Sequence, residues 1–201
     1  MARTEGHRER LLEAAKQLLT ERGYARTTAR DLVAASGTNL ASIGYHFGSK
    51  EALLTEALFA SLDELDQQFD RNQAAAAATD PPETPVDVLR TTWEGVIESF
   101  TSHHAVWIAS LEAFAQIEHL PDLRQRMSDL YEQMRGDMAD LARAMDPEAQ
   151  ADDTTARAFG SFHLALMAGL TLQWMIDPER APSADDLVAG LQSMVRIVGD
   201  A

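Results

Sequence analysis

The stretch TTARDLVAASGTNLASIGYHFGSKEAL, residues 27–53, decides the fold of the amino-terminal part of the chain. Thr28 followed three residues later by Asp31 is a capping-box pattern, which predicts the start of a short helix. Gly37 is the kind of residue that ends such a helix. Asn39 predicts the cap of a second short helix, which runs to about His46. Two short helices joined by a tight turn have the proportions of a helix-turn-helix.

Small and apolar residues are expected to hold these two helices together. We predict that Ala34, Ala35 and Ser36 lie where the helices cross, and that Ile43 packs the second helix against the first. Lys50 begins the next helix, where its ammonium and the backbone N–H groups suit a phosphate. A helical hairpin with a polar, solvent-facing side explains the same pattern, so the residues alone leave both interpretations open. The predicted outer face carries groups suited to phosphate oxygens and base edges: Thr38, Asn39, Ser42, Tyr45 and His46.

The rest of the chain also predicts helices, because apolar residues recur at helical spacing and no stretch alternates like a strand. A first helix with an apolar face ends at Gly23, and a long helix runs from Ser49 to about Asn72. The segment Ala74–Pro85 is predicted to be a linker, and Asp146–Pro147 to break a later helix. We therefore predict an all-α fold. Its remaining helices are expected near residues 86–102, 105–117, 122–145, 153–176 and 184–198.

Charge is distributed unevenly along the 201 residues. The whole chain has 17 Lys and Arg against 32 Asp and Glu, a formal net charge of −15. Residues 1–50 hold eight bases and five acids, whereas the remainder holds nine bases and 27 acids. A basic head on an acidic body favours contact with nucleic acid through the head. The absence of cysteine excludes thiolate sites, and the first residues do not resemble a secretory signal, so we expect a cytoplasmic protein.

Residues 27–53 closely resemble the DNA-binding segment of TetR-family (tetracycline-repressor-like) transcriptional regulators, above all in the run YHFGSKEAL at Tyr45–Leu53. The resemblance covers about residues 8–58. It implies a three-helix DNA-binding domain at residues 1–50 and an all-helical ligand-binding and dimerisation domain at residues 51–201. It also implies that the third helix enters the major groove, with one copy on each half-site of a palindromic operator.

The same resemblance assigns roles to individual residues. Gly44 departs from the aromatic residue or Asn usual in the family, and Val33 and Ser36 replace two common alanines. These departures weaken any inference about the operator sequence. By position, the resemblance implies that Thr28 caps its helix and touches phosphate, and it includes Thr27 in the DNA-binding set. The residues expected to face the groove are Thr38, Asn39, Ala41 and Ser42. Those expected to position the helix on phosphates are Tyr45, His46 and Lys50.

The carboxyl-terminal part carries two further patterns. The first is a set of aromatic and polar residues that fits either an ordinary core or a mostly apolar ligand site. The second is a pair of final helices, which in TetR relatives form a four-helix dimer interface. Residues 158–176, within the first of these helices, carry no charged side chain. We interpret them as a mostly buried helix of a soluble protein rather than as a membrane span. The candidate ligand-binding residues are Trp93, Phe100, His103, His104, Trp107, Phe114, His163, Met167 and Trp174.

These observations predict a dimeric, ligand-responsive regulator, most simply a repressor that a small apolar effector releases from double-stranded DNA. The sequence lacks the common motifs of metalloproteases, phosphate-binding loops and serine hydrolases, so we predict no enzyme activity, no cofactor and no metal. Two alternatives remain. One is a helical ligand-binding protein without DNA activity, and the other is a helical-bundle enzyme.

Overall fold

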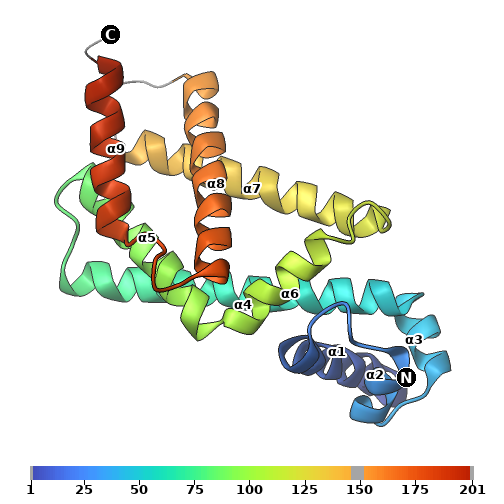
Figure 1. Ribbon diagram of the computed structural model, residues 1–201. Coiled ribbons are helices and arrows are strands. Elements are labelled where there is room, and N and C mark those ends of the chain that lie inside the picture. Colours follow the sequence, from blue (N-terminus) through green and yellow to red (C-terminus); the bar gives the residue numbers. More distant parts are fainter. Residues whose placement is uncertain (1, 146–151, 200–201) are drawn as a thin grey trace. The chain divides into compact units, whose positions relative to one another are not determined.

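The computed structural model describes residues 2–145 and 152–199, and these residues are helical apart from short connections (Figure 1). The described residues fall into two compact units, Met1–Gln68 with His103–Met127, and Phe69–Ser102 with Ser128–Ala201. The helices are α1 (Ala2–Arg22), α2 (Ala29–Ser36), α3 (Leu40–Phe47), α4 (Lys50–Thr79), α5 (Pro85–Ser102), α6 (His104–Phe114), α7 (Pro121–Met145), α8 (Asp153–Ile176) and α9 (Ala184–Gly199). The prediction of an all-α fold is confirmed.

The caps predicted at the two short helices are present. The Thr28 side chain accepts from the Asp31 backbone N–H and the Asp31 carboxylate accepts from Thr28, which completes the capping box of α2. Gly37 ends α2 in the left-handed region at φ 63°, a conformation that costs glycine little because it has no Cβ. The Asn39 side chain accepts from the Ser42 N–H at the start of α3. Local sequence therefore defines both ends of the turn between α2 and α3.

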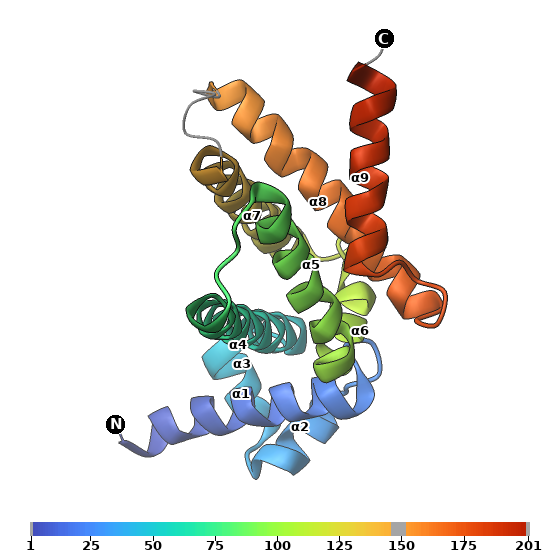
Figure 2. The same cartoon turned by 90° about the vertical axis from the view of Figure 1, so that its left-hand side faces the viewer.

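The first unit has a continuous apolar core. Helices α1, α2 and α3 pack together, as the turned view shows for α1 and α2 (Figure 2). The Tyr24 hydroxyl lies 3.1 Å from Thr55 Oγ1, which attaches the loop after α1 to α4. The Lys16 ammonium pairs with Glu64 at 2.5 Å at the rim. The fully buried core side chains are Leu11, Ala15, Leu32, Leu53, Leu54, Ala57 and Leu58.

Two details of the predicted packing are wrong. Ala34 and Ala35 are exposed, whereas Ser36, the third residue of that prediction, is buried together with Leu32, four residues earlier on the same face. The predicted linker at Ala74–Pro85 is helical as far as Thr79, because alanine is the strongest helix former and the run has no breaker before Pro81. The predicted break at Asp146–Pro147 lies outside the described residues.

The second unit is built around α5. This helix packs against α9 and α8, and its buried residues Leu89 and Trp93 form a core with Ala184 and Val188. Gly160 of α8 lies directly against the backbone of α7, since a Cβ placed there would be 2.3 Å from the carbonyl oxygen of Arg135. Helices α7 and α8 therefore approach each other through a position that has no side chain.

Helix α8 is less buried than the sequence predicts. It is the one described helix that is long and apolar enough to cross a membrane by length and composition, and 28% of its most apolar window is buried. Length and composition alone are weak evidence of a membrane span. Large apolar side chains of α8 and α9 are exposed: Phe162, Leu172, Ile176, Met194, Val195, Ile197 and Val198.

Candidate nucleic-acid interface and ligand site

Helix α3 presents one continuous face to solvent. Tyr45 is 78% exposed and Leu40 is 57% exposed, and the small residues Ala41 and Gly44 lie exposed between them. These four positions share one side of the helix because residues three and four apart are neighbours on its surface. No atom lies within 4 Å of a Cβ placed on Gly44, so the space above it is open. We call Leu40, Ala41, Gly44 and Tyr45 the outer face of α3.

Asn39 and Ser42 belong to the cap of α3. The Asn39 Oδ1 atom accepts from the Ser42 backbone N–H at 3.0 Å and from the Ser42 hydroxyl at 3.3 Å. Ser42 is buried and its hydroxyl also lies 3.5 Å from Nδ1 of His7. The expectation that Ser42 lies on the outer face is therefore wrong. Asn39 is exposed, and because the cap uses Oδ1, its amide Nδ2 can donate outward.

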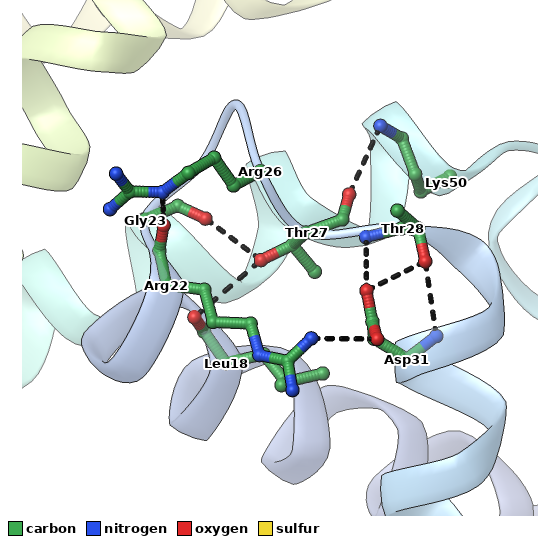
Figure 3. A network of polar contacts seen from close by, with 8 residues as sticks. All are labelled: Leu18, Arg22, Gly23, Arg26, Thr27, Thr28, Asp31 and Lys50. Carbon is green, nitrogen blue, oxygen red and sulfur yellow. Dashed lines mark hydrogen bonds and ion pairs between the residues drawn. The ribbon is translucent and has the colours of Figure 1, made fainter.

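A polar network holds the start of α2 against the end of α1 (Figure 3). The Thr28 hydroxyl donates to Oδ2 of Asp31 at 2.6 Å, and the Arg22 guanidinium pairs with Oδ1 at 2.7 Å. The hydrogen bonds from Thr28 hold the pKa of the Asp31 carboxyl below its ordinary value. Thr28 itself is exposed, so the cap leaves it at the surface.

Thr27 and Lys50 meet on the other side of this network. The Thr27 side chain is 1% exposed, and its hydroxyl donates to the Gly23 carbonyl at 2.8 Å. The Lys50 ammonium donates to the Thr27 carbonyl at 3.3 Å and pairs with Glu51 at 3.4 Å (Figure 3). The Thr27 side chain therefore holds the loop in place from inside the protein, contrary to the expectation of a DNA contact.

The remaining predicted interface residues are partly buried. Thr38 lies beside Ser36, with their hydroxyl oxygens 2.7 Å apart. The His46 ring meets the Tyr45 ring edge-on at 4.8 Å between centroids. An open cleft next to Asn39 joins the turn between α2 and α3 to the start of α1. Its lining residues are Gly6, His7, Glu9, Arg10, Gly37, Thr38 and Asn39.

Three residues of this surface were missed from the sequence. Leu40 was not predicted because it is apolar, although it precedes Gly44 by four residues and therefore lies beside it on the surface of α3. Arg30 is exposed on α2, and Arg10 lies in the cleft next to Asn39. The count of basic residues indicated such side chains, but it did not identify which of them reach the surface near α3.

Glu112 connects α6 to the loop after α1 within the first unit. Its Oε2 atom accepts from the Ala25 backbone N–H at 3.0 Å. Gly23 has φ 80°, and a Cβ on it would lie 2.4 Å from the same carboxylate oxygen. Gly23 is therefore required both by its backbone conformation and by the closeness of Glu112.

The predicted ligand residues divide between the two units. Within the second unit, the ring of His163 on α8 stacks against Trp93 of α5, with centroids 6.3 Å apart, and against Phe159, with centroids 6.2 Å apart. The rings of Phe100 and Trp174 lie 6.0 Å apart, and Met167 packs against the core cluster that contains Trp93. Phe159 was missed, although it precedes His163 by one helical turn.

The other predicted ligand residues lie in the first unit. Trp107 and Phe114 are on α6, which starts at His104, and His103 occupies the N-cap position of that helix. His104 and Phe114 are exposed. Within residues 2–145 and 152–199, no group of three His, Cys, Asp or Glu side chains is close enough to hold a metal ion.

The short helices, the capped turn and the exposed face of α3 define a helix-turn-helix protein. Residues 11–57 match the profile of bacterial regulatory proteins of the tetR family, and residues 85–196 match the carboxyl-terminal domain of BetI-type transcriptional repressors. The chain therefore belongs to the TetR family. Membership of this family of regulatory proteins confirms the prediction that the chain is not an enzyme.

Individual relatives agree with this assignment. The chain is 31% identical over 131 residues to the HTH-type transcriptional repressor KstR2 of Rhodococcus jostii, which covers 63% of this chain and 62% of the relative. The chain spans between 46% and 62% of the length of the KstR2 repressors that it matches.

Solved structures share the fold over nearly the whole chain. A transcriptional regulator from Pseudomonas aeruginosa superposes with a TM-score of 0.70 at 20% identity, covering 95% of this chain and 89% of that one. A regulator from Saccharomonospora viridis, solved in complex with choline, has a TM-score of 0.61 at 26% identity and covers 94% of this chain and 95% of that one.

Proposed function

We propose that the chain is a ligand-responsive transcriptional repressor that binds a palindromic operator as a homodimer in the cytoplasm. Residues 1–50 form its DNA-binding domain and residues 51–201 its ligand-binding and dimerisation domain. The observation that carries the proposal is the exposed outer face of α3, where a large aromatic ring and a leucine stand in solvent. An exposed apolar surface next to polar groups marks a site of interaction, and a helix of this kind fits the major groove.

The DNA contacts divide by chemistry. Leu40 and Ala41 suit the methyl group of thymine, while the Asn39 amide suits a base edge. Thr28, Thr38, Tyr45, His46 and Lys50 are proposed to contact phosphates. Thr27 and Ser42 act from within the head, since their side chains are buried and hold the loop and the cap.

The acidic composition of the chain is compatible with this role. Neutralising phosphate requires cations only on the surface that touches DNA. At physiological salt the Debye length is about 8 Å, so charges farther away are screened. Arg10, Arg26 and Arg30 are exposed in the head and supply positive charge there.

Replacing Lys50 with glutamine is expected to weaken binding to every DNA sequence. Each dimer loses two cations at phosphates, so the slope of log K against log salt becomes shallower by about two. The measurement is fluorescence anisotropy with the DNA upstream of the protein's own gene, titrated at several salt concentrations. Lys16→Gln removes the same charge from α1, where Lys16 already pairs with Glu64, and is expected to keep the slope. An unchanged slope for Lys50→Gln contradicts the phosphate contact.

The dimer is proposed to form through the exposed apolar residues of α8 and α9. A charge at Leu172, which is 50% exposed, is expected to abolish dimers because burying it in an apolar interface is costly. Light scattering should give twice the chain mass of 22.1 kDa for the wild type and the single mass for Leu172→Glu. Gln133→Glu, at an exposed position of α7, is the matched control and should remain dimeric. A monomeric wild type at micromolar concentration contradicts the dimer.

Effector binding is proposed to act through the second unit. The ligand must bind the DNA-incompetent form more tightly, and a coupling of about 1–3 kcal/mol is typical. Helix α4 contributes residues to both compact units, which makes it the natural route for the change. Choline, bound in the Saccharomonospora viridis relative, is a cation and serves as the charged comparison for apolar effectors in the operator assay.

A further inference from the structure

Trp93 is buried in the second unit with an unused hydrogen-bond donor. Its side chain is 2% exposed, and its indole Nε1–H has no partner. A buried donor without a partner destabilises the folded protein, so such groups are rare. Trp174 provides the contrast within the same unit, because its Nε1–H donates to the Pro182 carbonyl at 3.2 Å.

Trp93 belongs to a stack of three rings. His163 lies against Trp93 with 26° between the ring planes and against Phe159 with 30° between them. Burial lowers the pKa of His163 to about 4, so this ring is neutral at physiological pH. The stack therefore offers flat, uncharged surfaces next to the free donor of Trp93.

The side chains that pack against the cluster of Trp93 are apolar and partly buried. Two of the apolar side chains that pack against its cluster are Met145 and Met167, whose flexible thioethers adapt to different shapes. The other partly buried members are Val86, Ile97, Phe159, Leu166, Leu187 and Leu191. The cluster has more partly buried side chains than fully buried ones. A ligand that binds among the partly buried side chains therefore removes further apolar surface from water.

The buried polar groups of the second unit restrict the charge of the ligand. Among the described residues, the buried polar ones are Ser99, His163 and Thr171, and none is charged at neutral pH. The Nε of Arg135 is also buried, but its guanidinium pairs with Glu132 on the same helix. The Ser99 and Thr171 hydroxyls donate to carbonyls of their own helices, at 2.6 and 2.8 Å. Since no fully buried charge is present to balance an ion, the cluster suits a neutral molecule.

We infer that Trp93 anchors the effector by donating its indole N–H to a carbonyl oxygen of a neutral, ring-bearing apolar ligand that lies against the Trp93, His163 and Phe159 stack. This inference rests on the proposed ligand-binding role of the second unit and names the chemical class that the unit takes. The Trp93 N–H, which has no partner within the protein, gains a hydrogen bond when the ligand binds. This hydrogen bond stabilises the ligand-bound form.

The test compares two probes that differ at the acceptor, 2-acetylnaphthalene and 2-ethylnaphthalene. Calorimetry on the full-length wild type should show tighter binding of the acetyl compound by about tenfold, the factor that corresponds to about 1.4 kcal/mol. Trp93→Phe should abolish this preference by weakening the acetyl compound alone. Tyr131→Phe is the matched control, because it removes the hydroxyl of an exposed aromatic side chain on α7 of the second unit, and it should keep the preference.

A spectroscopic measurement distinguishes a hydrogen bond from altered packing. The Trp93 indole N–H resonance, assigned as the one that persists in both Trp107→Phe and Trp174→Phe, should move downfield with the acetyl probe and stay near its free position with the ethyl probe. This measurement uses wild-type protein, so it stands even where Trp93→Phe does not fold.

Several outcomes overturn the inference. They are equal affinity of the two probes, no binding of either, an unmoved Trp93 resonance, or tighter binding of tetramethylammonium than of the acetyl compound. The operator assay in the absence of ligand is run in parallel. If the wild type does not bind the operator, the repressor proposal is overturned and the probe result is unaffected. If operator binding responds to a different ligand but not to the acetyl compound, only the anchoring role of Trp93 is overturned.

Discussion

Gly160→Ala is expected to destabilise the second unit by about 2–3 kcal/mol, although Gly to Ala inside a helix ordinarily stabilises by up to about 1 kcal/mol. The reason is steric: the new Cβ would lie 2.3 Å from the carbonyl oxygen of Arg135 and 3.2 Å from its carbonyl carbon. These are backbone atoms of α7, so the two helices must separate. The midpoint of thermal unfolding is expected to fall by roughly 5–10 °C.

Gly136→Ala is the matched control for this prediction. Gly136 is an exposed position inside α7, and no atom lies within 4 Å of a Cβ placed there. The ordinary helix-propensity gain should therefore appear, with a small rise in the melting temperature. Equal melting temperatures for the two variants would contradict the close approach of α7 and α8.

Ala41→Glu is expected to weaken operator binding by at least about 100-fold, which corresponds to about 2.7 kcal/mol. Ala41 lies exposed in the centre of the outer face of α3, so a carboxylate there would meet phosphates and acceptor atoms of the groove. Folding should be unaffected, because glutamate is a good helix former and the position is near the helix start. Operator binding is measured by fluorescence anisotropy and folding by circular dichroism.

Ala75→Glu makes the same change at an exposed position in the second half of α4. Operator affinity is expected to stay within about twofold of the wild type, because a screened surface charge away from DNA contributes little. Tight operator binding by Ala41→Glu would show that another element reads the DNA, and the proposed role of α3 would be lost.

The helix-turn-helix could be predicted because its signals are local. Thr28 and Asp31, Gly37 and Asn39 each act within four residues, and each occupies the predicted cap. The side of α3 that faces the rest of the protein was harder to predict. Ser42 was assigned outward on its chemistry, whereas its position next to Ile43 and its hydrogen bond to Asn39 bring it inside.

The ligand site could be predicted only as a set of residue types. Three of the candidate ligand residues, Trp93, Phe100 and His163, are buried, and their contact with a ligand stays a prediction. The same set of candidate residues included Phe114, which is exposed on α6, because a sequence pattern carries no information across the break between α5 and α6. Whether a donor such as Nε1 of Trp93 finds a partner depends on residues distant in sequence, so the pattern could not reveal the free donor.

The hydrogen bond that the Ala25 N–H donates to Glu112 affects the design of hybrid regulators. A hybrid repressor made by exchanging only residues 1–50 would import a loop that was never matched to the carboxylate of this α6. A side chain in place of Gly23 would collide with that carboxylate, and a shifted loop would leave it unsatisfied. The transferable module is therefore discontinuous in sequence, and a functional graft should carry the donor's own counterpart of α6 together with its DNA-binding helices.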